Sequence, residues 1–155
     1  MDFAIHVSDE SVTESLGASL GALLLGRGKP CFIALDGDMG AGKTVFVRGL
    51  ASVLSPGSRV RSPTYTIVNE YRRGPIPLFH FDFCRLSDAE NELYGIGFEE
   101  YLAEGVCAAE WSEMAEALLP DERVRVKIDK TSDTERTICI SIPDGCGTLD
   151  FEGRG

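Results

Sequence analysis

Apolar residues recur at two different spacings in the first part of this chain, which predicts strands and helices in alternation. Residues 3–7 predict a short strand. From position 12 to 24, apolar residues return every three or four positions, which predicts one face of a helix. We expect Ser8 to cap the start of this helix and Gly28 to follow its end. Residues 31–35 form a continuous apolar, β-prone run, which is typical of a buried parallel strand.

The rest of the chain continues this alternation. After a glycine-rich loop at 37–44, apolar residues at helical spacing predict a helix that ends at Ser55. Ser87 and Glu90 have the spacing of a capping box, which predicts the start of another helix. The remaining predicted elements are strands at 65–71, 78–83, 106–110, 124–128 and 138–142, a helical turn at 98–102 and a helix at 113–119.

The glycine-rich loop fits the phosphate-binding pattern of Gly, four residues, then Gly-Lys-Thr. Backbone N–H groups can point at phosphate oxygens only where residues tolerate positive φ, which glycines do. We expect Lys43 to lie in a solvent-facing loop and to reach the β- and γ-phosphates, and Thr44 to offer its hydroxyl to Mg²⁺. The strand before the loop and the helix after it support a nucleotide site. The loop residues are Gly37, Asp38, Met39, Gly40, Ala41, Gly42, Lys43 and Thr44.

This order of elements predicts the fold class. Strand, helix, strand, glycine loop and helix are typical of an α/β protein with a central, mostly parallel sheet between two layers of helices, as in P-loop NTPases. A chain of 155 residues is long enough for one hydrophobic core. We therefore expect a single domain at 1–145 and a flexible tail at 146–155.

Two carboxylates follow apolar strands in the way that a metal site of a P-loop enzyme requires. Asp82 and Glu110 each end such a run. One could hold Mg²⁺, directly or through water, while the other orients the attacking water or also supports the metal. Thr64 is either part of a switch loop or the start of a strand. We expect His80 to make a structural hydrogen bond, and Trp111 to pack in the core rather than on a nucleotide.

The charge and composition of the chain limit the partners that it can have and the place where it can act. Acidic residues outnumber basic ones by 25 to 15, and no window is strongly basic, so any role with RNA requires a partner. No apolar run reaches membrane-spanning length, and the start of the chain, with Asp2, does not resemble a signal peptide. We therefore expect a cytoplasmic protein without membrane contact. The cysteines at 31, 84, 107, 139 and 146 form no C-x-x-C pair, which favours reduced thiols over zinc or disulfides.

Four motifs together resemble the bacterial TsaE (YjeE) ATPases. The resemblance runs from about residue 8 to Pro120, and more loosely through the last strands. The glycine loop alone is shared by many families, but its combination with the other motifs is specific. These are the loop followed by Arg48-Gly49, then Ser62-Pro63-Thr64-Tyr65-Thr66-Ile67-Val68, then His80-Phe81-Asp82 with Arg85-Leu86, and Glu110-Trp111.

The resemblance implies a function in tRNA modification. The family takes part in making N6-threonylcarbamoyladenosine (t6A) in tRNAs that read codons beginning with A. It hydrolyses ATP with Mg²⁺ and acts with TsaD, which transfers the threonylcarbamoyl group, and with TsaB. The resemblance implies that hydrolysis resets the complex between turnovers, and we expect it to be slow and stimulated by the partners. The tRNA is then held by the partners, in agreement with the acidic charge.

The resemblance also implies roles for individual residues. Val45, Cys84 and Ala109 depart from the usual family pattern, but none of them replaces a phosphate or metal ligand. The implied catalytic residues are Lys43, Asp82, Glu110 and Thr64. The implied metal ligands are Thr44, Asp82 and Glu110. The implied nucleotide contacts are Thr13, the loop residues Gly37 to Thr44, and Arg136.

Three other functions are compatible with a glycine loop of this kind. A small-molecule kinase should carry an arginine-rich lid, and a GTPase should carry Asn-Lys-x-Asp; this sequence has neither. A nucleotide-gated scaffold, which binds ATP without essential turnover, remains open at this point.

Overall fold

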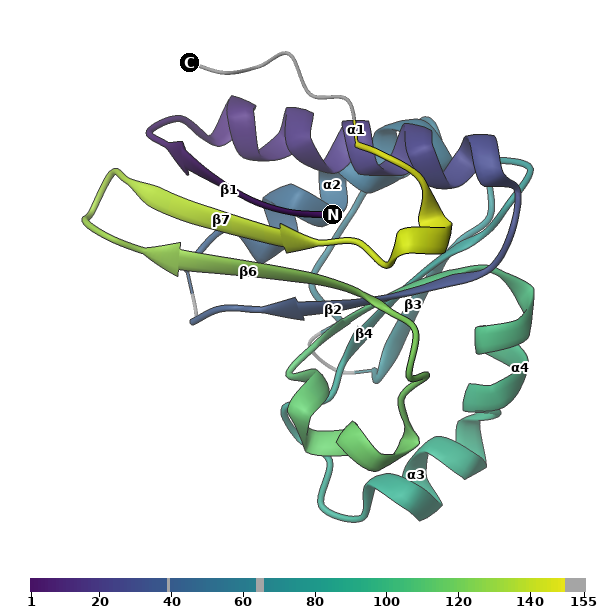
Figure 1. The fold of residues 1–155 in the computed structure, drawn as a ribbon. Helices are drawn as coiled ribbons and strands as arrows, with labels where there is room; N and C mark the ends of the chain where they lie inside the picture. Colours follow the sequence, from purple (N-terminus) through teal and green to yellow (C-terminus); the bar gives the residue numbers. More distant parts are fainter. Residues whose placement is uncertain (39, 64–65, 150–155) are drawn as a thin grey trace.

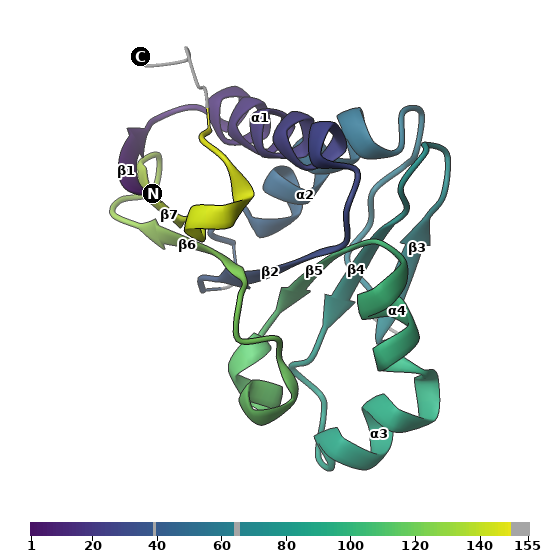
Figure 2. The same cartoon turned by 45° about the vertical axis from the view of Figure 1, so that its right-hand side comes forward.

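The computed structural model describes residues 1–38, 40–63 and 66–149 of the chain. Helices lie on both faces of one sheet (Figures 1 and 2). The elements in chain order are β1 (Asp2–Val7), α1 (Glu10–Arg27), β2 (Cys31–Asp36), α2 (Lys43–Leu54), β3 (Val68–Tyr71), β4 (Leu78–Asp82), α3 (Ala89–Ile96), α4 (Phe98–Glu104), β5 (Val106–Glu110), the 3-10 helix η1 (Ser112–Leu118), β6 (Val124–Lys130), β7 (Arg136–Ser141) and the 3-10 turn η2 (Asp144–Cys146).

Within these described ranges the sheet has seven strands in the order β1-β7-β6-β2-β5-β4-β3. The four central strands, β6, β2, β5 and β4, run parallel to one another. β1, β7 and β3 add antiparallel pairs at the two sides. The predicted α/β fold with a central parallel sheet and two helical layers is therefore confirmed.

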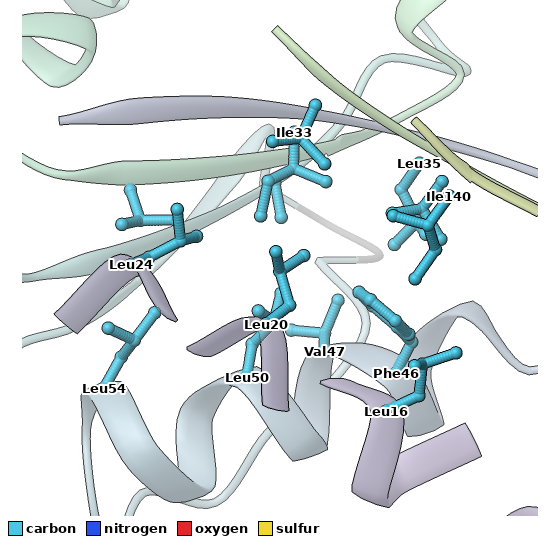
Figure 3. Packing of buried hydrophobic residues seen from close by; sticks show 14 of the residues in the cluster. Leu16, Leu20, Leu24, Ile33, Leu35, Phe46, Val47, Leu50, Leu54 and Ile140 are labelled. Atoms are coloured by element: carbon cyan, nitrogen blue, oxygen red, sulfur yellow. The ribbon is translucent and has the colours of Figure 1, made fainter. Parts of the chain in front are cut away.

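The two faces of β2 divide the core into two clusters. Ile33 and Leu35 point toward α1 and α2, where they meet side chains such as Leu20 (Figure 3). Phe32 and Ala34 point to the other face, which α3, α4 and η1 cover. Because successive side chains of a strand alternate between faces, a strand buried on both sides must be apolar throughout. This explains the continuous apolar run in the sequence.

The backbones of α1 and α2 touch where the two helices cross. A Cβ placed on Gly49 would overlap the carbonyl oxygen of Glu14 and lie 2.9 Å from the amide nitrogen of Ala18. A Cβ on Gly17 would likewise overlap the carbonyl oxygen of Phe46. Glycine is required at both positions because the opposing groups are backbone and cannot move aside.

Gly49→Ala should therefore destabilise the fold, whereas Gly26→Ala should not. Overpacking in a well-packed core costs at least about 2 kcal/mol at a contact as close as the one at Gly49. Gly26 lies in α1, and a Cβ added to it would have no heavy atom within 4 Å, so alanine there should add about 0.5–1 kcal/mol of helix stability. Urea unfolding of both variants measures the difference; equal midpoints would contradict the close approach.

Several predicted boundaries were wrong by one to three residues. The N-cap of α1 is Asp9, not Ser8, and its side chain accepts a hydrogen bond from the amide of Ser11. The N-cap of α3 is Asp88 rather than Ser87. Both errors exchange one good capping residue for its neighbour.

Three further predictions also differ from the structure. Glu92, not Glu90, accepts hydrogen bonds from the two amides just before α3. The helix expected at 113–119 is a 3-10 helix, Ser112–Leu118. The strand expected from residue 65 begins at Val68, and Tyr65 itself lies outside the described residues.

The end of the chain packs on the core further than expected. Cys146 and Leu149 are buried in the cluster that lies under α1 and α2. The expected tail at 146–155 thus includes two core side chains within its described part.

Of the helices in the described ranges, none has both the length and the apolar character that crossing a bilayer requires. All five cysteines are free thiols.

Candidate nucleotide site

The parallel strands bring the glycine loop and both carboxylates to one edge of the sheet. β2 ends at the loop, and its neighbour β5 ends at Glu110, which lies opposite Leu35. β4 is the next strand, and its Asp82 lies opposite Glu110. Neighbouring parallel strands end at the same edge, so three segments far apart in the sequence meet there. This edge is where open α/β sheets bind ligands.

The glycines of the loop adopt backbone conformations that other residues rarely adopt. Gly40 and Gly42 have φ of 76° and 109°. Gly37 has φ of 150°, and a Cβ on it would lie 2.5 Å from the carbonyl oxygen of Ile128 in β6. Apart from the two chain neighbours of Gly40, no heavy atom of the described residues lies within 4 Å of the place of a Cβ on Gly40. The described glycines of the loop thus have the positive φ angles that an anion-binding nest requires.

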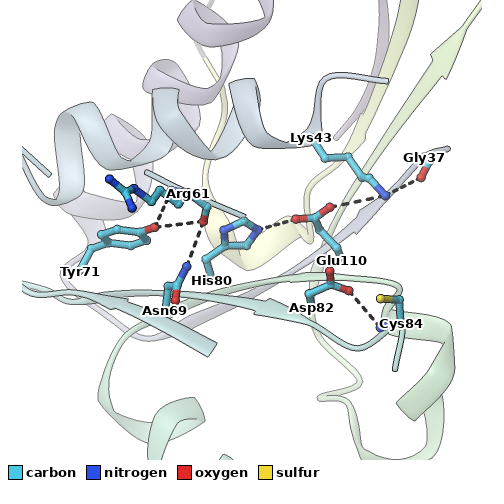
Figure 4. A network of polar contacts seen from close by, with 9 residues as sticks. All are labelled: Gly37, Lys43, Arg61, Asn69, Tyr71, His80, Asp82, Cys84 and Glu110. Carbon is cyan, nitrogen blue, oxygen red and sulfur yellow. Dashed lines mark hydrogen bonds and ion pairs between the residues drawn. The ribbon is translucent and has the colours of Figure 1, made fainter. Parts of the chain in front are cut away.

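Lys43 is buried, which corrects the expectation of a solvent-facing side chain. It is the first residue of α2 and only 6% exposed. Its Nζ donates a hydrogen bond to the carbonyl of Gly37 at 2.6 Å and lies 3.5 Å from Oε1 of Glu110 (Figure 4). Nζ also lies 5.2 Å from the ring centroid of Trp111, within the range of a cation–π contact. Lys43 is thus folded back over the loop.

Glu110 is held between two nitrogen donors. Its Oε2 lies 2.6 Å from Nε2 of His80, a residue with no exposed surface, so the predicted structural hydrogen bond of His80 is confirmed (Figure 4). Burial by itself raises the pKa of the Glu110 carboxyl, but the hydrogen bond and charge of His80, together with the charge of Lys43, outweigh burial and lower the pKa. Glu110 is therefore an ionised carboxylate inside the protein, available to a metal ion or to a water molecule.

Asp82 has a different environment. Its Oδ1 accepts a hydrogen bond at 3.0 Å from the amide of Cys84, just after the strand (Figure 4). This contact closes the turn at the end of β4, which is the capping role expected of an acid at a strand end. The two carboxylates thus lie side by side, but only Glu110 contacts Lys43.

Arg136 and Thr13 both lie beside the glycine loop. The guanidinium of Arg136 donates from Nε to the carbonyl of Ala41 at 3.1 Å and from Nη2 to the carbonyl of Gly40 at 3.3 Å. These bonds fix two peptide planes of the loop, which determines where their N–H groups point. Thr13 is buried, and its Cγ2 lies 3.9 Å from the place of a Cβ on Gly42.

The remaining predicted residues are in part outside the described chain. Thr44 is half-buried at the second position of α2, and Asp38 is exposed in the loop. Met39 and Thr64 lie outside the described residues. Sequence reasoning missed the contact of Trp111 with Lys43, although the position of this aromatic residue directly after Glu110 was a signal. Trp111 also packs partly on the second core cluster, as expected.

The donors at this edge suit Mg²⁺ bound together with phosphates. Within residues 1–38, 40–63 and 66–149, no three His, Cys, Asp or Glu side chains come together as a metal cluster. Mg²⁺ typically uses one or two carboxylates together with substrate phosphates, rather than a complete protein cage. A hydroxyl on Thr44 and the carboxylates of Asp82 and Glu110 fit that pattern.

Comparisons with known proteins agree on one family. The family model described as "Threonylcarbamoyl adenosine biosynthesis protein TsaE" matches residues 7–138. The tRNA threonylcarbamoyladenosine biosynthesis protein TsaE of Bacillus subtilis is 43% identical over 110 residues, which cover 70% of this chain and 68% of that protein. The Haemophilus influenzae protein of the same name is 36% identical over 139 residues, covering 88% of this chain and 87% of its own. A crystal structure of Bacillus subtilis YdiB matches with a TM-score of 0.75 and 29% identity, over 94% of this chain and 88% of that one. This chain therefore belongs to the TsaE family.

Proposed function

We propose that this chain binds ATP with Mg²⁺ at its glycine loop and hydrolyses it to ADP and phosphate. The observation that carries this proposal is the buried contact between Lys43 and Glu110. Nζ of Lys43 lies 3.5 Å from Oε1 of Glu110, beside the loop. A cation for phosphate oxygens and an ionised acid for metal or water are thus held in one site. Phosphoryl transfer needs mainly such positioning and charge neutralisation.

In this proposal, each residue of the site has its own role in binding or hydrolysis. Lys43 exchanges its bond to the Gly37 carbonyl for oxygens of the β- and γ-phosphates. Thr44, Asp82 and Glu110 hold the metal, directly or through water, and the Glu110 carboxylate also orients the attacking water. His80 fixes the direction of that carboxylate. Mg²⁺, when bound, neutralises charge on the phosphates. We assign Thr64, outside the described residues, to a switch loop.

The process served by this ATPase is t6A formation in tRNAs that read codons beginning with A. The relatives from Bacillus and Haemophilus are named for threonylcarbamoyladenosine biosynthesis in tRNA. In this proposal the chain acts with homologues of TsaD and TsaB, and its hydrolysis resets their complex between turnovers. The partners hold the tRNA, since a net charge of −10 opposes direct contact with a phosphate backbone.

Calorimetry and phosphate release test the proposal together. We expect ATP and Mg²⁺ to bind the chain, and phosphate release to be slow for the chain alone and faster with TsaD and TsaB homologues. If their assembly binds ATP but never cleaves it, the role is that of a nucleotide-gated scaffold. If neither the chain nor the assembly takes up ATP, the proposed site is wrong.

Replacing Arg136 should weaken ATP binding without removing it. Arg136→Ala leaves the carbonyls of Ala41 and Gly40 without their guanidinium donors, so the loop loses its fixed geometry. For partly exposed charged hydrogen bonds we expect a loss of about 1–1.5 kcal/mol, or roughly 5–10-fold in Kd. Lys130→Ala, at an exposed position in the same hairpin, is the control. Equal ATP affinity in both variants would contradict a role of Arg136 in shaping the loop.

A further inference from the structure

The negative charge of this chain is concentrated in one segment. Residues 86–122 contain eleven Asp and Glu and no Lys, Arg or His, whereas acidic and basic residues nearly balance in the rest of the chain. The segment includes α3, α4 and η1, which together form the layer on one face of the sheet (Figure 2). Seven of these eleven acids belong to α3, α4 and η1, so this helical layer carries much of the excess negative charge.

A groove lined by both apolar side chains and glutamates lies within this acidic layer. Its volume is about 620 Å³, and it runs along α3 and the start of α4 to the end of η1. Each of these two helices buries only one side chain, Leu93 in α3 and Phe98 in α4. Tyr94 is 87% exposed, and among the described residues only Met1 and Met114 are other exposed large hydrophobic residues. Residues that line the groove include Glu90, Tyr94, Ile96, Phe98, Glu99 and Leu118.

We propose that this groove, which we call the α3–α4 groove, docks a protein partner that presents Lys or Arg side chains around an apolar one. The apolar side chain contacts Tyr94, and the cations lie over the acidic rim at Glu90 and Glu99. Charge complementarity of this kind selects partners and speeds association. An aromatic residue exposed within a polar rim is typical of an interface hot spot.

The same charges argue against other occupants. RNA carries a negative charge on each phosphate, and the acidic rim repels it. A second copy placed groove to groove would bring two acidic layers together, which is unfavourable because like charges meet across the contact. A cationic protein surface is the occupant that the groove fits.

The groove is built from the two chain segments that follow the candidate metal ligands in the sequence. α3 begins shortly after Asp82, and Leu118 belongs to η1, which starts directly after Glu110 and Trp111. In this proposal, a partner bound across α3 and η1 contacts the segments that follow Asp82 and Glu110. The identification of this partner as the TsaD–TsaB assembly rests on the proposed function.

Calorimetry of the full chain against a complex of TsaD and TsaB homologues tests the groove. Tyr94→Ala should weaken the complex by at least about 30-fold, the loss of one hot spot. Glu90→Gln with Glu99→Gln should weaken it roughly 3–10-fold at low salt, with less effect at high salt because salt screens exposed charges. Glu10→Gln with Asp133→Asn removes two exposed acids outside the groove and should change the affinity less than about twofold.

The outcomes separate this inference from the proposed function. ATP affinity of the isolated Tyr94→Ala chain should equal that of the wild type, which shows that the variant folds. If the wild type binds the assembly and Tyr94→Ala binds it equally well, the groove is not the docking site, while the partnership stands. If the wild type does not bind the assembly, both the docking at the groove and the proposed partnership are wrong. Concentration-dependent dimers that Tyr94→Ala abolishes would overturn the assignment to a cationic partner in favour of a second copy.

Discussion

Lys43→Ala is expected to remove measurable ATP binding and, at the same time, to lower the stability of the fold. A hydrogen bond to a charged group contributes about 1.5–3 kcal/mol, so losing the cation that serves two phosphates should raise Kd by about 100-fold or more. Lys43 is also buried against Glu110. Removing it leaves a buried carboxylate with His80 as its partner, which we expect to cost up to about 3 kcal/mol of unfolding free energy.

A double variant separates the two effects. In Lys43→Met with Glu110→Gln, both buried charges are replaced by neutral groups of similar size, so much of the lost stability should return. ATP binding should remain absent, because the lysine assigned to the phosphates is still missing. Calorimetry and urea unfolding on the same preparations measure both quantities. Full ATP affinity in either variant would contradict the assignment of Lys43 to the phosphates.

Glu110→Gln should reduce the cleavage step far more than the binding step. Gln keeps the size of the side chain, but it has no negative charge to orient the attacking water and is a poorer ligand for Mg²⁺. We expect single-turnover phosphate release by the assembled complex to fall by about 100-fold or more, and the Kd for ATP to change only a few-fold. A wild-type rate of cleavage in this variant would remove Glu110 from the mechanism.

Asp82→Asn is the matched comparison, since it lies opposite Glu110 on the neighbouring strand. Asparagine can still accept the hydrogen bond from the amide of Cys84, so the turn after β4 should persist. If Asp82→Asn raises the Mg²⁺ concentration needed for half-maximal activity more than Glu110→Gln does, Asp82 is the more direct metal ligand. The reverse order assigns that position to Glu110.

The order of elements could be predicted from the sequence because it depends on local patterns. A continuous apolar run at 31–35 can be buried on both sides only in a central strand, and β2 is such a strand. The precise start of α1 could not be predicted, since Ser8 and Asp9 are both good caps and tertiary contacts select one. The motif at 37–44 identified the loop, because its glycines meet a backbone requirement that is itself local.

The contacts within the site depend on strand pairing, which no local pattern contains. That His80 meets Glu110 follows from the register of β4 against β5. That Arg136 reaches the loop follows from the position of β7 in the sheet, almost a hundred residues further along the chain. The burial of Lys43 was missed for the same reason: the carboxylate and the indole ring that cover it come from the end of β5.

The crossing of α1 and α2 has a consequence for the motions of this protein. Because their backbones touch at Gly17 and Gly49, neither helix can slide along the other without a steric clash. Backbone amides of both helices should therefore exchange with deuterium through one shared opening, whereas α3, with a single buried side chain, should open more often and on its own. The protein then consists of a stiff half that holds Lys43 and a looser half whose helices carry acidic residues but no basic ones. Deuterium labelling can follow each half separately.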